Sequence, residues 1–562
     1  MKGKNQGEIV KGFPSTSQVT SQLNVTNILR HGARNFSKQE IISENPDGSI
    51  FRYTYKDAYI RANRLAKSLA SLGLGLGDRI GVLEWNTYRH FEIYFGLSGT
   101  GAVMLLLNLR LAQQDITYIV NHAKTKFIFV DESLLNIAET IAASCKTVKG
   151  YVIITCKPLN EITTSLEPIF SFEELLSKST PNYRWPNLDE TSAYAACYTS
   201  GTTGRPRGIF YSHRDIFLQA LMYAANASIS INDCVFQIVP MFHVLGWGTP
   251  FAATLVGAKM VFPGRYSLKD LNRLVKTVVR ENVTVVNGAT AILMPMLESI
   301  RQMDEKPDLS RTRFITGASE PPKSMMKGFW ELTGAEVIHT YGSTEAHALV
   351  TLNRLIPIRK QDFSDEEMWE FKRKQGYIVS GLDVKILDPL TGKELPHDGI
   401  SSGEILLKGP WIAGRYYNAA ESEEQFTKGG YFKTGDIGTL DSEGFLKITD
   451  RIKDIIKSGG EWISSVDMEN AIISHPKVVE AAVVGCPHPK WEERPLALVI
   501  LREELDIKII REEIYEQLTE KFAKWQLPDK ILFVDQILKT SVGKIDKKSI
   551  REKYKNIYKP NH

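Results

Sequence analysis

The sequence predicts an α/β protein with a large N-terminal domain and a small α+β C-terminal domain. Three observations support this prediction. Helical and strand patterns alternate up to about residue 340, short β-rich segments follow from about residue 376, and a mixed pattern returns after about residue 451. A chain of 562 residues also exceeds a single hydrophobic core, so two to four folding units are expected.

The first part of the chain has the pattern of strand–helix–strand units. Residues 56–73 carry apolar side chains at helical spacing, and residues 79–84 follow like a strand. Further strands are expected at 126–130, 234–239, 258–262 and 283–287. Between the last two, a helix over 267–281 would present one apolar face, formed by Leu268, Leu271, Leu274, Val275 and Val278. Such units predict a largely parallel sheet with helices outside it.

The second part predicts antiparallel strands and then a separate small domain. Between 376 and 450, β-rich runs are separated by Gly, Asp and Pro turns, and residues 440–450 have the pattern of a hairpin. A domain boundary is expected near Arg451. After it we expect helices near 465–474 and 508–523, strands at 478–485 and 530–537, and a basic helical tail.

Composition is ordinary for a soluble globular protein. Apolar residues make up 43% and charged residues 24%, and the net charge of +4 gives no argument for nucleic-acid binding. The five cysteines include no C-x-x-C pair, so reduced thiols and a cytoplasmic location are expected. No signal peptide or transmembrane segment is predicted, since the apolar run 95–108 is too short to span a bilayer. Peripheral membrane contact stays open.

The stretch YTSGTTGRPRG, residues 198–208, is suited to holding phosphate. Its glycines let backbone N–H groups converge on oxygen atoms, its hydroxyl side chains add donors, and its arginines add charge. Gly204 is followed by Arg-Pro-Arg-Gly rather than Lys-Ser/Thr, so the loop is not a Walker A motif. A dinucleotide-binding G-x-G-x-x-G is absent too.

Three later segments add to the phosphate hypothesis. TYGSTEAHALV, residues 340–350, places Glu345 after a tight turn, where a carboxylate beside phosphate could hold Mg²⁺. Asp436 follows a Thr-Gly turn and could accept both hydroxyls of a ribose. KTSVGKIDKK, residues 539–548, places Lys544 on a glycine loop near the C-terminus.

The four segments, in this order, resemble the AMP-forming adenylate superfamily, which includes acyl-CoA synthetases. The resemblance runs from about residue 30 to 555, and residues 240–259 and 450–472 are most similar to medium- and long-chain fatty-acid–CoA ligases. It implies an N-terminal adenylation domain, 1–450, with two αβ-layered sheets and a β-rich subdomain at about 376–450. It also implies a small mobile C-terminal domain, 451–562.

The resemblance implies that a carboxylic acid attacks ATP to give an acyl-adenylate, which CoA converts to acyl-CoA. Phosphates would be bound by Thr199, Ser200, Gly201, Thr202, Thr203, Gly204 and Arg207, with Mg²⁺ between Thr199 and Glu345. Thr344 would face the α-phosphate, and Lys544 would bridge it to the acid. The rest of the nucleotide would contact Gly317, Ala318, His339, Thr340, Tyr341, Asp436, Arg451, Lys453, Lys457 and Trp462.

The same resemblance implies a rotation of the C-terminal domain about Lys453 between the two half-reactions. Gly459 and Gly460 would then line the CoA channel. His243 and Trp247 match positions that line the acid tunnel of fatty-acid-ligase relatives. Two positions depart from the family pattern: Arg207 replaces a usual lysine, and Leu538 replaces a usual proline.

Alternatives remain beside a medium- or long-chain fatty acid as substrate. Short-chain, hydroxy or aryl acids fit the same superfamily, and a non-catalytic adenylate-binding protein is a different class. A peptide-synthetase module is disfavoured, because the chain ends about twenty residues after Lys544. The expected partners are therefore small molecules, and the resemblance alone suggests a homodimer. The motif set assigns no role to His347.

Overall fold

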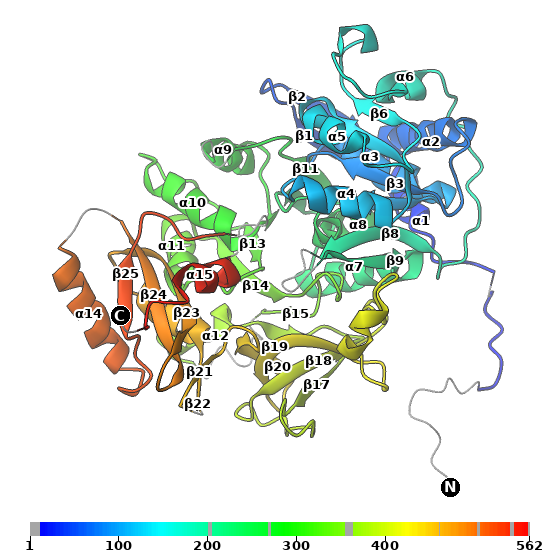
Figure 1. The fold of residues 1–562 in the computed structure, drawn as a ribbon. Coiled ribbons are helices and arrows are strands. Elements are labelled where there is room, and N and C mark those ends of the chain that lie inside the picture. The colour runs from blue at the N-terminus through cyan, green and yellow to red at the C-terminus, as the bar shows by residue number, and fades with distance from the viewer. Residues whose placement is uncertain are drawn as a thin grey trace.

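A computed structural model of the chain contains three β-sheets with helices packed on their faces (Figure 1). It describes residues 12–18, 20–199, 205–267, 271–354, 363–459, 461–502, 506–539 and 545–559. Within this part of the chain, none of the helices combines the length and the apolar character needed to cross a bilayer.

The largest sheet has thirteen strands, and its parallel section is flanked by antiparallel pairs on both sides, at β1–β2 and from β14–β15 onward. Its order is β17-β18-β19-β20-β16-β15-β14-β13-β12-β10-β11-β1-β2. The strands are β1 (Glu40–Glu44), β2 (Ile50–Thr54), β10 (Cys234–Gln237), β11 (Lys259–Phe262), β12 (Val285–Asn287), β13 (Arg313–Thr316), β14 (Glu336–Tyr341), β15 (Thr351–Leu352), β16 (Gly376–Ile378), β17 (Asp383–Leu387), β18 (Gly403–Lys408), β19 (Phe432–Leu440) and β20 (Phe445–Arg451). In sheet order, the neighbouring strands β1, β11, β10, β12, β13 and β14 pair in parallel. From β14 to β17, again in sheet order, each strand pairs antiparallel with the next. The predicted β-rich segment therefore continues the parallel sheet through the β14–β15 pair.

A second sheet has seven strands in the order β7-β6-β5-β3-β4-β8-β9. Its members are β3 (Arg79–Leu83), β4 (Val103–Leu106), β5 (Thr125–Asp131), β6 (Tyr151–Ile154), β7 (Ile169–Ser171), β8 (Ala193–Thr199) and β9 (Arg207–Ser212). All pair in parallel except β8 and β9, which form an antiparallel hairpin. That hairpin encloses the predicted phosphate loop.

The two large sheets enclose a shared layer of helices. Alternate residues of β10 show this: Val235 belongs to the core between the sheets, and Phe236 belongs to the core on the opposite face. The inner layer contains α1 (Thr26–Asn35), α2 (Tyr55–Ser71), α3 (Tyr88–Gly96), α7 (His213–Ala227) and α8 (Thr249–Val256). The outer layers contain α9 (Asn272–Arg280), α10 (Thr290–Arg301) and α11 (Lys323–Thr333) on one sheet, and α4 (Gln113–His122) and α5 (Leu135–Ala142) on the other. The predicted two αβ-layered sheets are confirmed. Two further helices, α6 (Phe172–Ser177) and α12 (Asp365–Arg373), lie beside these layers.

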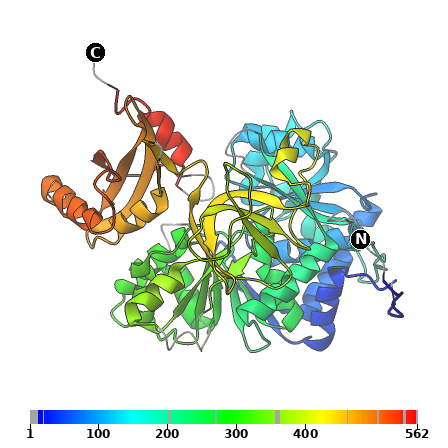
Figure 2. The ribbon, with the colours of Figure 1, turned by 90° about the horizontal axis from the view of Figure 1, so that it is seen from below.

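The third sheet belongs to the C-terminal lobe, drawn orange to red in Figure 2. Its five strands are β21 (Ile456–Ser458), β22 (Glu461–Ile463), β23 (Val478–His488), β24 (Glu492–Leu501) and β25 (Lys530–Phe533). Helices α13 (Ser465–Ile473) and α14 (Ile507–Thr519) cover one face, and α15 (Lys547–Tyr554) covers the other. The small α+β unit is confirmed, although its second long strand, β24, was not predicted.

A buried carboxylate, Glu281, ties together three elements of the large sheet. It lies directly after α9 and accepts hydrogen bonds from Lys259 of β11 at 2.9 Å, Arg52 of β2 at 2.6 Å and Arg280 of α9 at 2.9 Å. Although burial opposes ionisation, these three cations lower the pKa of Glu281 to about 2. The ionised carboxylate therefore stabilises the folded state wherever the unfolded chain would already be deprotonated.

We expect a Glu281→Gln variant to be less stable than the wild type by about 2 kcal/mol at pH 7, because three partly exposed cations lose the buried carboxylate that they share. The folded pKa lies below the ordinary value, so this stabilisation is complete above about pH 4.5 and is lost as the pH falls toward 2. Thermal unfolding of both proteins across pH 2 to 7 should show the difference in midpoint shrinking below pH 4.5. A Glu174→Gln variant, which breaks an exposed pair with Lys178, should change the midpoint little at any pH.

Candidate active site

Nine of the predicted site residues lie at or just after the ends of parallel strands of the large sheet. Residues 240–248 follow β10, Gly317 and Ala318 follow β13, and residues 342–348 follow β14. Because these strands are parallel neighbours or near neighbours, their carboxyl ends share one edge of the sheet. Ligands of open α/β sheets bind outside this edge.

The β8–β9 hairpin brings the ends of the phosphate loop to this edge. Thr199, the last residue of β8, is the register partner of Arg207, the first residue of β9. The Thr199 hydroxyl oxygen is buried and has no hydrogen-bond partner among the described residues. The predicted phosphate-binding residues Ser200, Gly201, Thr202, Thr203 and Gly204 lie outside the described residues.

Glu345, in the segment after β14, and Arg207, on β9, approach the same tyrosine. Glu345 is only 9% exposed, and its Oε1 accepts a 2.7 Å hydrogen bond from the hydroxyl of Tyr416. The guanidinium carbon of Arg207 lies 4.3 Å from the centroid of the Tyr416 ring, in cation–π contact. Beside them, the carbonyl of Thr344 accepts a 2.6 Å hydrogen bond from the Tyr211 hydroxyl. The structure therefore brings the predicted metal-ligand carboxylate and a phosphate-loop cation together, through a residue that the sequence did not indicate.

The segment after β13 is tightly packed against β14. A Cβ at Gly317 would lie 2.6 Å from the carbonyl oxygen of Thr340, closer than any side chain allows, and Trp247 lies just beyond it. Ala318 has a φ of +72°, which is unusual for a residue with a side chain. These positions form a backbone-lined wall, suited to the flat face of a base.

The buried side chain of His339 supports the backbone wall. Its side chain is buried, and Nδ1 donates to the carbonyl oxygens of Arg373 at 2.7 Å and Lys374 at 3.0 Å. Burial lowers the pKa of His339, so a neutral ring with a proton on Nδ1 fits both contacts. The ring thus fixes the strand end on which Thr340 and Tyr341 lie.

Asp436, Arg451 and Tyr341 form one hydrogen-bonded group. Asp436 of β19 and Arg451 of β20 are register partners, and Arg451 Nε donates to Asp436 Oδ1 at 3.0 Å. The Tyr341 hydroxyl donates to the other oxygen, Oδ2, at 2.6 Å. The charge of Asp436 raises the pKa of Arg451, and burial together with the same charge raises that of Tyr341. A carboxylate 5% exposed and held from two sides is a fixed acceptor for polar ligand groups.

Residues 244–248 form a left-handed turn that carries Trp247. Their φ angles are all positive, from +45° at Val244 to +81° at Gly248, in a region that costs about 1–2 kcal/mol per residue for L-residues with side chains. Trp247 packs with Val239, Val244 and Ala348 in a small apolar cluster. Trp247 is buried, and His243 is half-buried at the start of the turn.

Buried side-chain amides hold this turn in place. Asn287 and Gln237 both donate to the carbonyl of Gly246, at 3.0 and 3.1 Å. Gln219 of α7 donates from Nε2 to the carbonyl of Trp247 at 3.2 Å and to that of His347 at 3.3 Å. The Gln219 amide thus links the turn after β10 to the segment after β14.

Two of these supporting residues were missed by the sequence analysis. Gln219 could have been found, because a glutamine on the buried face of an amphipathic helix needs a partner. Tyr416 gave no signal, since its partner Glu345 lies 71 residues away. His347 is fully buried and stacks on Tyr211 with centroids 4.8 Å apart, and burial lowers its pKa to about 3, so it serves packing as a neutral ring.

The predicted C-terminal site residues are only partly described. Lys453 lies close enough to Arg207 and Arg451 that their charges, after burial, lower its pKa. Gly459 has a φ of +63° and donates its backbone N–H to the Trp491 carbonyl at 3.0 Å. Lys457 is exposed and pairs in register with Trp462, whose side chain lies outside the described part. Gly460 and Lys544 lie outside it as well.

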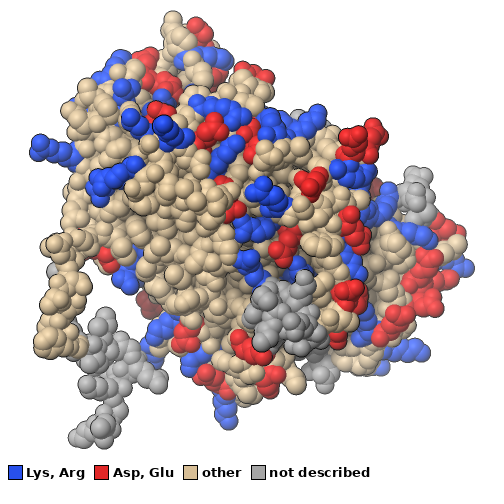
Figure 3. Space-filling view, turned by 180° about the vertical axis from the view of Figure 1, so that it is seen from behind, with Lys and Arg blue, Asp and Glu red and all other residues tan. Residues whose placement is uncertain are grey.

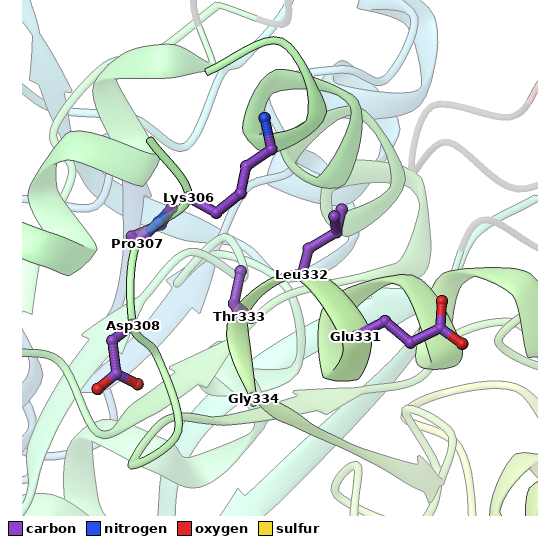
Figure 4. Close-up of a pocket in the computed structure, with 7 residues that line it drawn as sticks. All are labelled: Lys306, Pro307, Asp308, Glu331, Leu332, Thr333 and Gly334. Carbon is purple, nitrogen blue, oxygen red and sulfur yellow. The ribbon is translucent and has the colours of Figure 1, made fainter. Parts of the chain in front are cut away.

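Two surface hollows lie away from this site. One is formed by residues 306–308 and 331–334, which precede β13 and β14 and therefore lie at the amino edge of the sheet (Figure 4). The other lies between α9, α10 and the C-terminal lobe, where Arg502 pairs with Glu298 at 3.5 Å. Among the residues that the structure describes, no group of three or more His, Cys, Asp or Glu side chains could hold a metal ion.

Comparisons with known proteins agree with this geometry. The family described as AMP-binding enzyme matches residues 29–417, and the AMP-binding enzyme C-terminal domain matches residues 467–544. A long-chain-fatty-acid–CoA ligase of Thermus thermophilus is 41% identical over 98% of this chain and 99% of its own length. A medium-chain-fatty-acid–CoA ligase of Ectopseudomonas oleovorans is 36% identical over 96% of this chain and 97% of its own. The crystal structure of an anthranilate CoA ligase with anthranoyl-AMP superposes with a TM-score of 0.84 at 26% identity, covering 95% and 98% of the two chains.

We expect a Gly248→Ala variant to lose stability and to displace Trp247, because the added Cβ would lie 2.0 Å from Gln219 Oε1. Gly444→Ala is a matched control: Gly444 has the same φ of +81°, but nothing lies within 4 Å of its Cβ position. The control measures backbone strain, about 1 kcal/mol, and Gly248→Ala should cost at least about 2 kcal/mol more in denaturant unfolding. Equal losses in the two variants would show that the Gln219 contact does not constrain the turn.

Proposed function

The chain belongs to the family of AMP-binding enzymes, and on that premise we propose that it is an AMP-forming acid–thiol ligase, an acyl-CoA synthetase. A carboxylate would attack the α-phosphorus of ATP, with release of pyrophosphate, and the CoA thiol would then displace AMP from the acyl-adenylate. The observation that carries this proposal is the meeting of Glu345 and the phosphate-loop residue Arg207 on the two sides of Tyr416.

The residues around the phosphate loop fit the needs of this chemistry. Two anions must approach each other, and negative charge grows on the leaving pyrophosphate, so fixed cations and donors supply most of the catalysis. Arg207, Lys453 and Arg451 gather positive charge here: burial lowers the pKa of Lys453, and the charges of the two arginines lower it further. In this proposal the residues 199–204 and Arg207 hold the β- and γ-phosphates, Thr344 faces the α-phosphate, and Lys544 joins it to the acid.

A magnesium ion would bind between Glu345, Thr199 and the phosphates. The buried Thr199 hydroxyl without a described partner and the Glu345 carboxylate are the hard oxygen donors that this ion prefers. A site with few protein ligands is expected when phosphate oxygens complete the coordination. When bound, the ion would neutralise charge on the leaving pyrophosphate.

We assign the nucleoside to the surface between β13, β14 and β19. The backbone wall at Gly317 and Ala318, braced by His339, Thr340 and Tyr341, would take the adenine. Asp436 would accept from the ribose hydroxyls while Arg451 and Tyr341 keep it oriented. Lys457 and Trp462 remain proposed nucleotide contacts.

The acid is proposed to be a medium- or long-chain fatty acid. The apolar cluster around Trp247 suits an alkyl tail, with His243 proposed as its neighbour in the acid site, and the two relatives named for such acids support this choice. An aryl acid is the second candidate, because the structural relative bound to anthranoyl-AMP acts on one.

The division into two domains completes the proposal. Residues 1–450, with a β-rich subdomain at about 376–450, would bind ATP and the acid, and residues 451–562 would rotate about Lys453 between the half-reactions. Lys544 would then leave the site, and Gly459 and Gly460 would admit the pantetheine of CoA. The positive φ of Gly459 suits close approach of a ligand to backbone.

We further propose a cytoplasmic enzyme. All five cysteines are free thiols, four of them buried, which suits a reducing compartment. Lysine and arginine side chains are interspersed with acidic ones over the upper and right parts of the face shown in Figure 3. A homodimer and contact with a membrane surface remain expectations.

The test of the proposed function is thioester formation with a panel of acids from acetate to palmitate, together with benzoate and anthranilate. We expect CoA-dependent turnover that is greatest for acids with medium or long alkyl chains, with AMP and pyrophosphate as products. Formation of ADP would contradict the proposal, and a preference for the aryl acids would favour the second candidate.

The role of Lys544 can be tested on the separate half-reactions. In a Lys544→Ala variant, the rate of acid-dependent ATP–pyrophosphate exchange should fall at least about a hundredfold, because a positioned cation lowers the activation barrier by several kcal/mol. The same variant should still convert a supplied acyl-adenylate and CoA to acyl-CoA at a rate near that of the wild type. If both half-reactions survive, Lys544 does not act in adenylation.

A further inference from the structure

Residues 411–417, which we call the strap, join the phosphate-loop hairpin to the segment of Glu345. The Trp411 indole donates to the carbonyl of Leu349 at 2.9 Å, and the backbone N–H of Ala413 donates to the carbonyl of Glu345 at 2.7 Å. At the other end of the strap, the backbone N–H of Tyr417 donates to the carbonyl of Gly208 at 2.8 Å. One short segment therefore sets the spacing between the two halves of the proposed triphosphate site.

Tyr416 is the strap residue whose side chain enters this site. It is 5% exposed, and Phe426 packs edge-on against its ring at 5.5 Å. Burial and the neighbouring charge of Glu345 raise the pKa of Tyr416 far above neutrality, so its hydroxyl stays a donor. The bond to a carboxylate at 2.7 Å is charge-assisted and is stronger than a neutral hydrogen bond.

The geometry around Tyr416 limits how Glu345 can present itself. The Tyr416 hydroxyl donates to Oε1, so the second oxygen, Oε2, does not carry this bond and is open to a cation. The backbone N–H of Ala413 holds the Glu345 backbone carbonyl, and Tyr416 holds the side chain. Glu345 is therefore fixed at two points. Arg207 lies on the Tyr416 ring, which keeps the guanidinium beside the carboxylate without a direct ion pair being required.

We propose that Tyr416 is a positioning residue that orients Glu345 toward the divalent cation of the metal–ATP complex and sets its distance from Arg207. The inference rests on the proposed function of the site. A merely structural role for the strap would affect ATP binding with and without metal alike. The proposed role affects only the part of the affinity that depends on the metal.

The experiment measures ATP binding to the full-length protein by calorimetric titration, once with excess Mg²⁺ and once with EDTA. For Tyr416→Phe we expect the Kd with Mg²⁺ to rise about tenfold, the fold-change that corresponds to loss of one charge-assisted hydrogen bond. The Kd with EDTA should change less than about twofold. Tyr55→Phe is the control, because it removes a buried tyrosine hydroxyl that donates at 2.7 Å to the Ala258 carbonyl, and neither residue belongs to the proposed site. Both of its Kd values should match the wild type.

A double-mutant cycle tests whether Tyr416 acts through Glu345. Glu345→Gln should abolish most of the gain in affinity that Mg²⁺ gives, and adding Tyr416→Phe to it should cause no further loss. Binding of the Mn²⁺–ATP complex to each variant can be followed by electron paramagnetic resonance, which needs no turnover. It should rank the affinities of the variants in the same order.

Three results would overturn the inference: equal losses with and without metal in Tyr416→Phe, no loss in either condition, or additive losses in the double variant. Failure of the proposed function looks different. In that case the wild type itself would show no binding of ATP that Mg²⁺ strengthens, whereas a wild type that binds Mg²⁺–ATP tightly beside an unaffected Tyr416→Phe would reject the inference alone.

Discussion

The site depends on backbone that is held in the left-handed region at the carboxyl edge of the parallel strands. Eleven described residues other than glycine have a positive φ, and six of them, Val244, Leu245, Trp247, Ala318, His347 and Ala348, lie in segments that follow β10, β13 and β14. Such conformations cost about 1–3 kcal/mol each and persist only where the surroundings fix them. Here the surroundings are buried amides: Gln219, Gln237 and Asn287 all donate to carbonyls of the turn that carries Trp247. In this turn, the backbone strain and the hydrogen bonds that compensate for it lie in the same buried segment.

The site also brings charged side chains together. Asp436 is neutralised within its own pair of strands by Arg451, whereas Lys453 lies near two cations and has its pKa lowered in part by them. A cluster of cations that is unfavourable without ligand becomes favourable beside a triphosphate, because its charges then meet their counter-charges. The cost of gathering Arg207, Lys453 and Arg451 is therefore offset on binding, and the gain is specific for a highly charged anion.

Sequence reasoning predicted most of the helices and strands and a part of the contacts within the site. Amphipathic spacing predicted the helix that became α2, and β-rich runs predicted β3, β5 and β10 to β12, because these signals are local. Asp436 and Arg451 were assigned to one task from resemblance, and the register of β19 with β20 is the physical reason that they meet. Tyr416 and the continuation of the sheet through β14 and β15 could not be predicted, since both depend on pairings between distant segments. Strand β24 was missed because the charged residues at its start obscured the apolar run that follows.

Two of the contacts between the C-terminal lobe and the rest of the chain suit the proposed rotation. Asn470 donates to Glu320 at 3.1 Å, but Glu320 is also paired with Arg373 and Lys374, so it keeps its cations if Asn470 leaves. Arg502 and Glu298 form a pair in which both side chains are substantially exposed, and such pairs contribute about 1 kcal/mol or less. Neither contact leaves an uncompensated buried charge when it breaks. A single site that must serve two reactions needs a lobe that is held in place but is released at a small cost in free energy. These two contacts hold the lobe, and breaking them costs little.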